Sequence, residues 1–326
     1  MTKNNKNILV TGCAGFIGFH TCLALLKNKH FNVFGIDNLN NYYDKQLKLD
    51  RLKILKNDKS FVFNKINISN KKKVDENFKK NKYDYVVHLA AQAGVRYSIE
   101  SPETYVKSNQ IGFFNILDSS RLISVKHFLY ASSSSVYGTS IKTKQSEDDN
   151  TDSPISFYAA TKKSNELMAY SYSNIFKLAT TGLRFFTVYG PYGRPDMSPH
   201  KFVSAIKNNE TIYLNNYGKH KRDFTYIDDV VISITRLLDK TPKNKIPQQI
   251  INVGCNSPKK ISEFIKIIES LLNKKAKIKL RPLQPGDVKD THANINKLNK
   301  ITLNRKKISL EQGMKKFIDW FNEYYK

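Results

Sequence analysis

The sequence predicts an α/β fold built on a doubly wound parallel sheet, with a smaller region at its C-terminal end. Through the first half of the chain, short apolar segments typical of buried strands alternate with segments whose apolar residues have helical spacing. A glycine-rich loop at residues 11–18 joins the first apolar segment, residues 8–10, to the first helical segment, residues 19–26. Together these two observations are typical of α/β proteins that bind a ligand at the ends of the strands.

The glycine-rich loop predicts a dinucleotide site. Gly12, Gly15 and Gly18 allow a tight turn, a close approach to a diphosphate and close packing of helix on strand. The anion would lie at the positive end of the new helix. The next apolar segment, residues 32–36, ends in Asp37, about where a ribose-binding carboxylate is expected. An acid there favours NAD over NADP, because it repels a 2′-phosphate. The alternative is an ordinary glycine turn, but the position of Asp37 favours the dinucleotide site.

The remaining elements continue the alternation. We expect further strands at residues 61–63, 85–89, 126–131 and 179–185, and long helices at residues 104–122 and 158–175. Beyond residue 185, turn residues such as Pro191 and Gly193 separate short mixed elements, which predicts a region that closes over the strand ends. We expect a Rossmann domain at residues 1–185 that binds NAD, with a returning segment near residues 222–256, and a mainly substrate-binding region at residues 186–326.

Composition narrows the class of protein. The 326 residues are 40% hydrophobic, enough for a sizeable core, and no run approaches the roughly 18 apolar residues that span a bilayer. The polar N-terminus has no signal-peptide pattern, and the three cysteines have neither metal-ligand nor disulfide spacing. We therefore expect a cytoplasmic protein with no metal and no membrane partner.

The net charge of +26 fits either a nucleic-acid partner or lysines scattered over solvated faces. Without a nucleic-acid-binding motif, we favour the second interpretation.

Two segments carry candidate catalytic groups. Tyr158 and Lys162 are four residues apart and share one face of a helix. A nearby cation lowers the pKa of a tyrosine, which then becomes a usable general base. Residues 132–135 are four serines at the carboxyl end of the fifth strand, where this architecture binds ligands. Each feature alone has an ordinary alternative, a surface helix pair or a serine-rich turn. In this order with the glycine loop and Asp37, they are far more specific.

With these residues in place, the chain resembles the extended short-chain dehydrogenase/reductase family, and within it the nucleotide-sugar 4-epimerases. The resemblance runs nearly end to end and is strongest in GIDNLN (35–40), HLAAQAGVR (88–96), RFFTVYGP (184–191), RDFTYIDD (222–229) and QPGDV (284–288). The additional segment GRPDM (193–197) is similar to that of the UDP-glucuronate 4-epimerases in particular.

The resemblance implies a role for each matching residue. The implied catalytic residues are Ser133, Tyr158 and Lys162. The implied NAD-binding residues are Gly12, Gly15, Phe16, Ile17, Gly18, Asp37, Asn38, Asn67, Ile68, Leu89, Ala90, Ala91, Asn109, Tyr158 and Lys162. The implied substrate-binding residues are Ser134, Ser135, Thr187, Arg194, Lys201, Phe202, Tyr213, Arg222 and Asp287. Arg194 would reach the sugar carboxylate; the alternative is a surface arginine in a proline-rich loop. Asn67 and Asn294 depart from the family, which often has aspartate at these positions.

The resemblance further implies NAD-dependent 4-epimerisation of UDP-glucuronate to UDP-galacturonate through a 4-keto intermediate. Related dehydratases and decarboxylases usually carry an acid where this chain has Ser135, so the chemistry is expected to stop at oxidation and reduction. The alternatives are a 4-epimerase for UDP-glucose/galactose or for a UDP-N-acetylhexosamine or its uronate, and an NAD-sensing or RNA-binding protein on the same fold. The helices at 104–122 and 158–175 match those that form a homodimer in the family, which is associated with polysaccharide biosynthesis.

Overall fold

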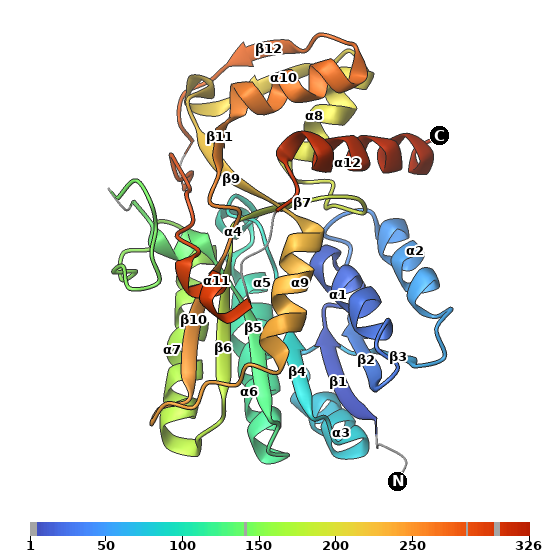
Figure 1. Ribbon diagram of the computed structural model, residues 1–326, viewed down its shortest axis with the longest axis vertical. Helices are drawn as coiled ribbons and strands as arrows, with labels where there is room; N and C mark the ends of the chain where they lie inside the picture. The colour runs from blue at the N-terminus through green and yellow to red at the C-terminus, as the bar shows by residue number, and fades with distance from the viewer. Residues whose placement is uncertain (1–4, 140–141, 285, 303–306) are drawn as a thin grey trace.

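The computed structural model describes residues 5–139, 142–284, 286–302 and 307–326, and its centre is a seven-stranded parallel sheet (Figure 1). The strand order is β10-β6-β5-β4-β1-β2-β3, and every neighbouring pair is parallel. The strands are β1 (Lys6–Thr11), β2 (Phe31–Asp37), β3 (Phe61–Lys65), β4 (Tyr85–His88), β5 (His127–Ser133), β6 (Thr180–Phe185) and β10 (Gln248–Val253). The order reverses between β1 and β4, which is where such sheets bind ligands.

Helices cover both faces of the sheet. The base of the molecule, as we call this sheet with its helices, contains α1 (Phe16–Leu26), α2 (Lys45–Leu55), α3 (Lys71–Asn81), α4 (Tyr97–Glu100), α5 (Pro102–Tyr105), η1 (Val106–Ile111), α6 (Gly112–Leu122), η2 (Ser134–Tyr137), α7 (Phe157–Phe176), α9 (Ile227–Leu238) and α11 (Asn296–Thr302). Strand β1 shows how two cores arise: Ile8 and Val10 pack in the cluster that contains α1 and α9, while Leu9 packs with α3 and α6. Successive side chains of a strand point to opposite faces, so both sides of β1 are buried.

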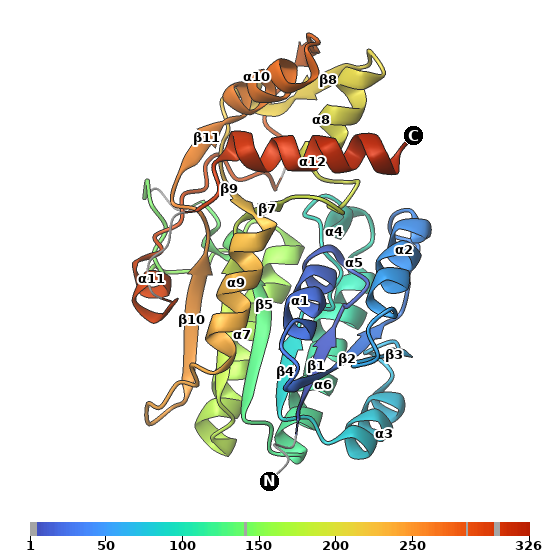
Figure 2. The ribbon, with the colours of Figure 1, turned by 45° about the vertical axis from the view of Figure 1, so that its right-hand side comes forward.

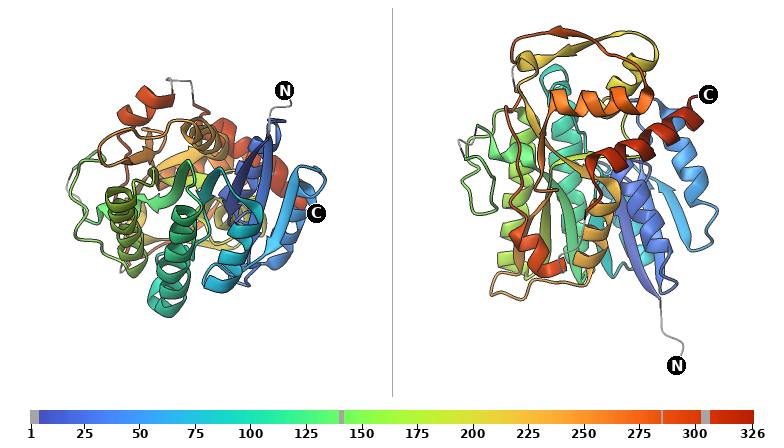
Figure 3. Two further views of the ribbon diagram at one scale, coloured as in Figure 1. Left: turned by 90° about the horizontal axis from the view of Figure 1, so that it is seen from below. Right: turned by 45° about the horizontal axis from the view of Figure 1, so that its top comes forward.

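A second region, here called the cap, lies at the carboxyl ends of the strands (Figures 1 and 2). It contains a three-stranded sheet in the order β11-β9-β7 and a parallel pair, β12-β8. Its elements are β7 (Thr187–Tyr189), α8 (Ser198–Lys207), β8 (Thr211–Leu214), η3 (Asn215–Gly218), β9 (Lys221–Tyr226), β11 (Pro258–Lys260), α10 (Ile261–Leu272), β12 (Lys277–Leu280) and α12 (Leu310–Tyr324). In the right-hand view of Figure 3, α10 (orange) and α12 (red) lie above the sheet, at the end opposite the N-terminus.

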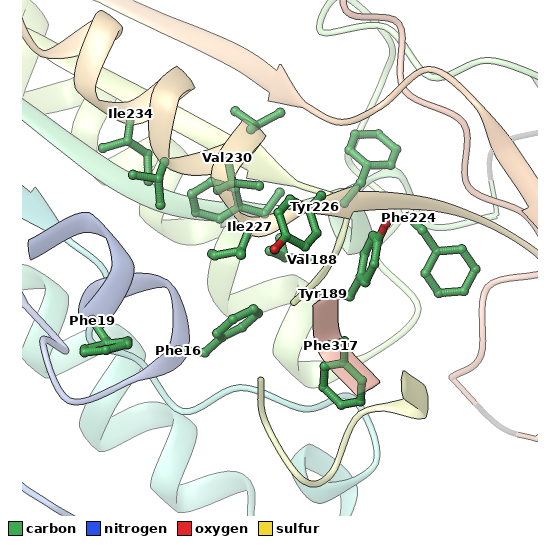
Figure 4. Close-up of a cluster of buried hydrophobic side chains, with 14 of the residues drawn as sticks. Phe16, Phe19, Val188, Tyr189, Phe224, Tyr226, Ile227, Val230, Ile234 and Phe317 are labelled. Atoms are coloured by element: carbon green, nitrogen blue, oxygen red, sulfur yellow. The ribbon is translucent and has the colours of Figure 1, made fainter. Parts of the chain in front are cut away.

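One apolar cluster joins the base to the cap. Phe16 and Phe19 of α1 meet Ile227 and Val230 of α9, and the same cluster continues to Phe317 of α12 (Figure 4). Val188, Tyr189, Phe224 and Tyr226 come from the small sheet and fill the space between. Because these side chains are buried together, the cap is held to the base by a continuous core.

The predicted α/β fold is confirmed, and each of the six predicted strands is present with its ends shifted by a few residues at most. The predicted helix at 104–122 differs in detail, because its middle forms a π-helix, η1, between α5 and α6. The chain returns to the base through α9 and β10, so β10 pairs with β6 only after the first part of the cap, β7 to β9, has been traversed. Within the described residues, no helix is long and apolar enough to cross a membrane.

Candidate active site

A cavity of about 420 Å³ lies where the cap meets the carboxyl ends of the strands. It brings together most of the predicted site residues, which come from segments far apart in the sequence. Those that line it are Gly12, Gly15, Phe16, Ile17, Gly18, Asp37, Asn38, Ile68, Leu89, Ala90, Ala91, Ser133, Ser134, Ser135, Tyr158, Lys162, Thr187, Arg194, Arg222 and Asp287. The groups predicted to bind the cofactor and those predicted to bind substrate therefore share one space.

The glycine loop has the shape that a diphosphate requires. Gly12 has φ +72°, and a Cβ there would lie 2.8 Å from the backbone nitrogen of Ala90. A Cβ at Gly18 would lie 2.1 Å from the carbonyl oxygen of Gly12, so only glycine allows α1 to pack this closely on the loop. No side chain caps the N-terminus of α1, and its first residues, Phe16 and Ile17, line the cavity. These features fit the diphosphate of NAD at the positive end of a helix.

Asp37 ends β2 inside the same cavity. Its Oδ1 accepts a hydrogen bond from the Leu39 amide at 2.8 Å, and its Oδ2 accepts one from the Ala14 amide at 3.2 Å. Burial raises the pKa of Asp37, while these amides and Lys48 act in the opposite direction. Each carboxylate oxygen has a second lone pair, so Asp37 can still accept a hydrogen bond from a ribose hydroxyl. The residues present thus fit NAD at both its diphosphate and its ribose.

The three predicted catalytic residues lie on adjacent elements. Ser133 is the last residue of β5, and its hydroxyl lies 3.1 Å from that of Ser135. Tyr158 and Lys162 lie in the first two turns of α7, whose start is capped by Ser156. The Lys162 Nζ donates to the carbonyl oxygen of Ala131 at 2.9 Å, which ties α7 to β5. The helix and the strand together therefore position all three groups.

Burial shifts the pKa values of both Tyr158 and Lys162. It raises the pKa of Tyr158, and the Ser133 hydroxyl and the Arg194 charge oppose that effect without reversing it. The direction is opposite to the lowered tyrosine pKa expected from Lys162, because desolvation outweighs the nearby charges. Burial also lowers the pKa of Lys162 to about 8. A positive charge added to the cavity would favour the phenolate.

Behind the serines lies a buried ion pair that the sequence did not reveal. Arg184 donates to both carboxylate oxygens of Glu166, with distances of 2.9 Å from Nε and 2.8 Å from Nη2. The hydroxyl of Ser132 donates to the same Glu166 at 2.5 Å. Because both partners are about 95% buried, the pair is well satisfied, and it links β5, β6 and α7 beneath the catalytic trio.

Arg194 is held in the cavity by Asp196. Its Nε donates to Oδ1 of Asp196 at 2.9 Å, its Nη2 pairs with Oδ2, and the Tyr42 hydroxyl donates to the same Oδ2 at 3.0 Å. Burial lowers the pKa of Arg194, but the Asp196 charge and hydrogen bonds outweigh it, and the net pKa is raised. The side chain of Arg194 is 21% exposed, so Arg194 is not a solvated surface arginine.

Five predicted site residues do not line the cavity, and their roles stay predictions. Asn109 is buried and donates to the carbonyl of Gln92 and to the Thr161 hydroxyl, both at 3.0 Å, so it joins the loop after β4 to α7. Asn67 is exposed and accepts from Ser69 in a turn. The others lie in the cap, where Phe202 packs near Phe264 and Lys201 is exposed.

Tyr213, the fifth of these residues, is 46% exposed and lies against Arg281, whose guanidinium carbon is 3.5 Å from the ring centroid. Pro285, in the segment that also contains Asp287, lies outside the described residues.

Several cavity residues were not predicted as site residues from the sequence. Tyr42, Lys48 and Gln92 all line the cavity. Lys48 is almost fully buried, donates to the carbonyl of Asn40 at 2.8 Å and to its side-chain oxygen at 2.6 Å, and lies over the Tyr43 ring. The helix that carries Lys48 has no clear apolar face in sequence, so a buried lysine within it could not be distinguished from a solvated one.

Residues 8–254 match the NAD dependent epimerase/dehydratase family. The chain belongs to this family. Protein CapI of Staphylococcus aureus is 47% identical over 98% of this chain and 99% of its own length. A probable UDP-glucuronate 4-epimerase of Rhizobium meliloti is 40% identical over 98% of this chain and 97% of its own.

A crystal structure of the UDP-glucuronic acid 4-epimerase of Bacillus cereus, in complex with UDP-glucuronic acid and NAD, has the same fold. It superposes with a TM-score of 0.92 at 34% identity and covers 98% of this chain and all of that one. The family assignment therefore agrees with the glycine loop, the Tyr158–Lys162 pair and the cavity between base and cap.

Proposed function

We propose that this family member is a UDP-glucuronate 4-epimerase, which interconverts UDP-glucuronate and UDP-galacturonate with NAD as cofactor. The observation that carries the proposal is the presence of Arg194, a held and mostly buried cation, in one cavity with Tyr158 and the glycine loop. With its Nε edge held by Asp196, the guanidinium can offer its Nη1 and Nη2 hydrogens to a substrate carboxylate as two parallel hydrogen bonds. A neutral hexose offers no such partner, so the cavity favours a uronate.

The chain's own groups handle the proton. Tyr158, as phenolate, takes the proton from the 4-hydroxyl of the sugar and returns it after the sugar has turned in the cavity. Ser133 hydrogen-bonds the reacting oxygen, and Lys162 stabilises the phenolate from the next turn of α7. NAD, held by the glycine loop and Asp37, would supply hydride transfer at C4, and its oxidised ring would add the positive charge that favours the phenolate against burial.

The uronate creates a hazard that the cavity must control. Oxidation at C4 gives a β-keto acid, which loses carbon dioxide readily when its carboxylate bond lies perpendicular to the carbonyl plane. Arg194 can hold the carboxylate out of that geometry, because two parallel hydrogen bonds define an angle as well as a position. Ser134 and Ser135 line the same cavity and offer hydroxyl groups but no acid. The arrangement thus supports epimerisation without loss of carbon.

We extend the proposal to the organisation of the protein. The base binds NAD, with residues 1–185 joined by α9 and β10, and the cap binds the UDP end of the substrate. The protein acts in the cytoplasm as a homodimer and serves polysaccharide biosynthesis. Large apolar side chains that are at least 40% exposed on η1, α6 and α7 support the dimer; they are Val106, Ile111, Phe114, Leu122, Phe157, Leu167, Tyr170, Ile175 and Phe176. Such a concentration of exposed apolar groups marks an interaction surface.

The decisive experiment supplies purified protein with a panel of UDP-sugars and separates the products by chromatography. We expect UDP-glucuronate to give UDP-galacturonate, with NAD(H) released from the denatured enzyme. Conversion of UDP-glucose or a UDP-N-acetylhexosamine with no turnover of UDP-glucuronate would replace this function by one of the other epimerases. Absence of turnover on every sugar, with a salt-dependent affinity for RNA, would favour a binding protein instead.

A further inference from the structure

Arg51 is a fully buried arginine that the chemistry above does not use. It lies on α2, is 0% exposed, and forms no ion pair within the described residues. Its Nε has no hydrogen-bond partner there either. Burying an arginine without a direct ion pair is costly; the hydrogen bonds of Arg51 go to neutral groups, although its charge acts on the buried Asp37. The role of Arg51 therefore follows from the groups that its guanidinium contacts.

The contacts of Arg51 join the two halves of the site. Its Nη1 donates to the carbonyl oxygen of Ala14, in the glycine loop, at 2.8 Å, and to the Tyr43 hydroxyl at 2.8 Å. Its Nη2 donates to the carbonyl oxygen of Tyr192 at 2.6 Å. Tyr192 is two residues before Arg194. One guanidinium therefore spans the loop that fits the cofactor diphosphate and the loop that carries the cation for the sugar carboxylate.

A second contact holds the same cap loop. The ring Nε2 of His20, on α1, donates to the carbonyl oxygen of Pro191 at 2.9 Å. Burial lowers the pKa of His20 to about 4, and the charge of Arg51 acts in the same direction, so His20 is neutral near pH 7. The two adjacent carbonyls of Pro191 and Tyr192 are thus bound from two different helices of the base.

The loop itself is under backbone constraint, so its position depends on these anchors. Tyr192 has φ +56°, a left-handed conformation that a tyrosine rarely adopts. A Cβ at Gly193 would lie 2.9 Å from the carbonyl oxygen of Gly190, which shows how tightly the turn closes. Strained conformations persist only where the surroundings hold them. Loss of an anchor would let the turn relax and carry Arg194 with it.

We propose that Arg51, supported by His20, is a positioning residue that sets Arg194 relative to the cofactor loop and thereby protects the 4-keto uronate from decarboxylation. This inference rests on the proposed function. The positive charge of Arg51 lies beside the glycine loop, where it acts on Asp37 and also favours the anionic cofactor. Arg51 thus acts on the geometry of the reaction without touching the reacting atoms.

The test measures how each variant partitions its intermediate. In decarboxylation the C5–C6 bond breaks, carbon dioxide leaves, and the electron pair forms an enolate that takes a proton at C5. The hydride stays on the cofactor, so each event gives one UDP-4-keto-pentose and one NADH. Only folded molecules form either product, so the ratio of the pentose product to UDP-galacturonate does not change when a variant is merely less stable.

Arg51→Lys keeps the charge but loses the fork that spans two loops. We expect it to retain NAD, to raise the pentose ratio at least about tenfold and to lower kcat on UDP-glucuronate about tenfold, as small misplacements of a reacting group do. Inhibition by UDP should stay within about threefold of wild type, because the UDP end is bound elsewhere in the cap. His20→Leu should change the ratio in the same direction by a smaller factor. Arg236→Lys, which alters an arginine bonded to the carbonyl of Thr302 on the far side of α9, is the matched control and should leave the ratio unchanged.

The outcomes separate the proposals. Folded Arg51→Lys and His20→Leu proteins with the wild-type ratio would overturn the positioning role, even if both melt at lower temperature. Should Arg51→Lys fail to fold, the ratio measured for His20→Leu decides the question. If the wild-type protein forms no UDP-galacturonate at all, it is the proposed function that fails, and the ratio has no meaning.

Discussion

Two parallel strands show how differently the base and the cap are built. All four residues of β4 are buried, whereas all four residues of β12 are exposed. Strand β4 has neighbours on both sides and helices on both faces, while β12, at the outer end of the cap, pairs with β8 alone among the described strands (Figure 1). Because its central strands are buried, the base can hold the reacting groups in fixed positions. The outer part of the cap is exposed, so packing constrains its residues less. We expect substitutions in the base to change turnover and substitutions in the cap to change substrate choice or affinity.

The largest expected effect is in the base, at Tyr158. Tyr158→Phe keeps the ring and removes the proton acceptor, so turnover should fall at least about a hundredfold, the usual range for general acid–base catalysis. UDP affinity, measured by calorimetry, should stay within about twofold, because the cap is intact. Near-normal turnover in this variant would contradict both the mechanism and the division between base and cap.

Arg194 tests the boundary between the two regions. Arg194→Ala should lower kcat/KM for UDP-glucuronate by about tenfold to a hundredfold, since a charge-assisted pair is lost and Asp196 is left without its partner. Product analysis by mass should also reveal a pentose nucleotide and trapped NADH. Arg194→Lys, which keeps the charge without the two parallel hydrogen bonds, should fall in between. If Arg194→Ala handles glucuronate as wild type does, Arg194 does not bind the carboxylate.

Lys162 sharpens the comparison through stability. Burial lowers its pKa to about 8 in the folded protein, against 10.5 for an unperturbed lysine. Between these values the unfolded chain binds more protons, so this group makes stability rise with pH across that window. Lys162→Met should therefore be inactive yet more stable near pH 7, by about 2 kcal/mol. The gain should shrink as pH rises from 8 to 10.5, which urea unfolding at several pH values measures. If the difference in stability between Lys162→Met and wild type does not depend on pH, burial does not lower the pKa of Lys162 in the folded protein.

The smallest expected effect is in the cap, at Tyr213. Because Tyr213 is half exposed and lies against Arg281 outside the cavity, Tyr213→Ala should change KM for UDP-glucuronate by less than about threefold. Arg222→Ala is the contrasting variant, since Arg222 lines the cavity, and should raise KM about tenfold at nearly constant kcat. A large effect at Tyr213 would mean that substrate draws this residue inward and that the cap closes on binding.

The base could be predicted almost element by element because its signals are local. Apolar segments such as residues 8–10 and 85–88 need no partner in sequence to indicate a buried strand, and the glycine loop and Asp37 have a fixed order along the chain. Strand β10 was missed as a strand because half of its residues are polar, which suits an edge position. Helix α2 was missed because Lys48 and Arg51 interrupt its apolar pattern.

The cap side of the site depends on contacts that no local pattern records. Arg194 was expected in the cavity, but the Tyr42 hydroxyl that supports its partner Asp196 comes from a distant segment, so this contact could be seen only in the structure. The same is true of the Glu166–Arg184 pair and of Asn109, whose π-helical segment faces α7. Residues such as Lys201 and Tyr213 were named through resemblance alone, and the structure places them outside the cavity.

The late return of β10 to the sheet has a consequence for how the chain is made. Strand β6 cannot pair on its outer edge until residues 248–253 have been synthesised, so a nascent chain that ends at residue 185 exposes a row of unpaired amides and carbonyls. Loop closure over residues 186–247, which contain the first part of the cap, is slow compared with formation of the adjacent β5–β6 pair. Until β10 has been made and has paired with β6, the catalytic half of the protein remains an open sheet that can aggregate.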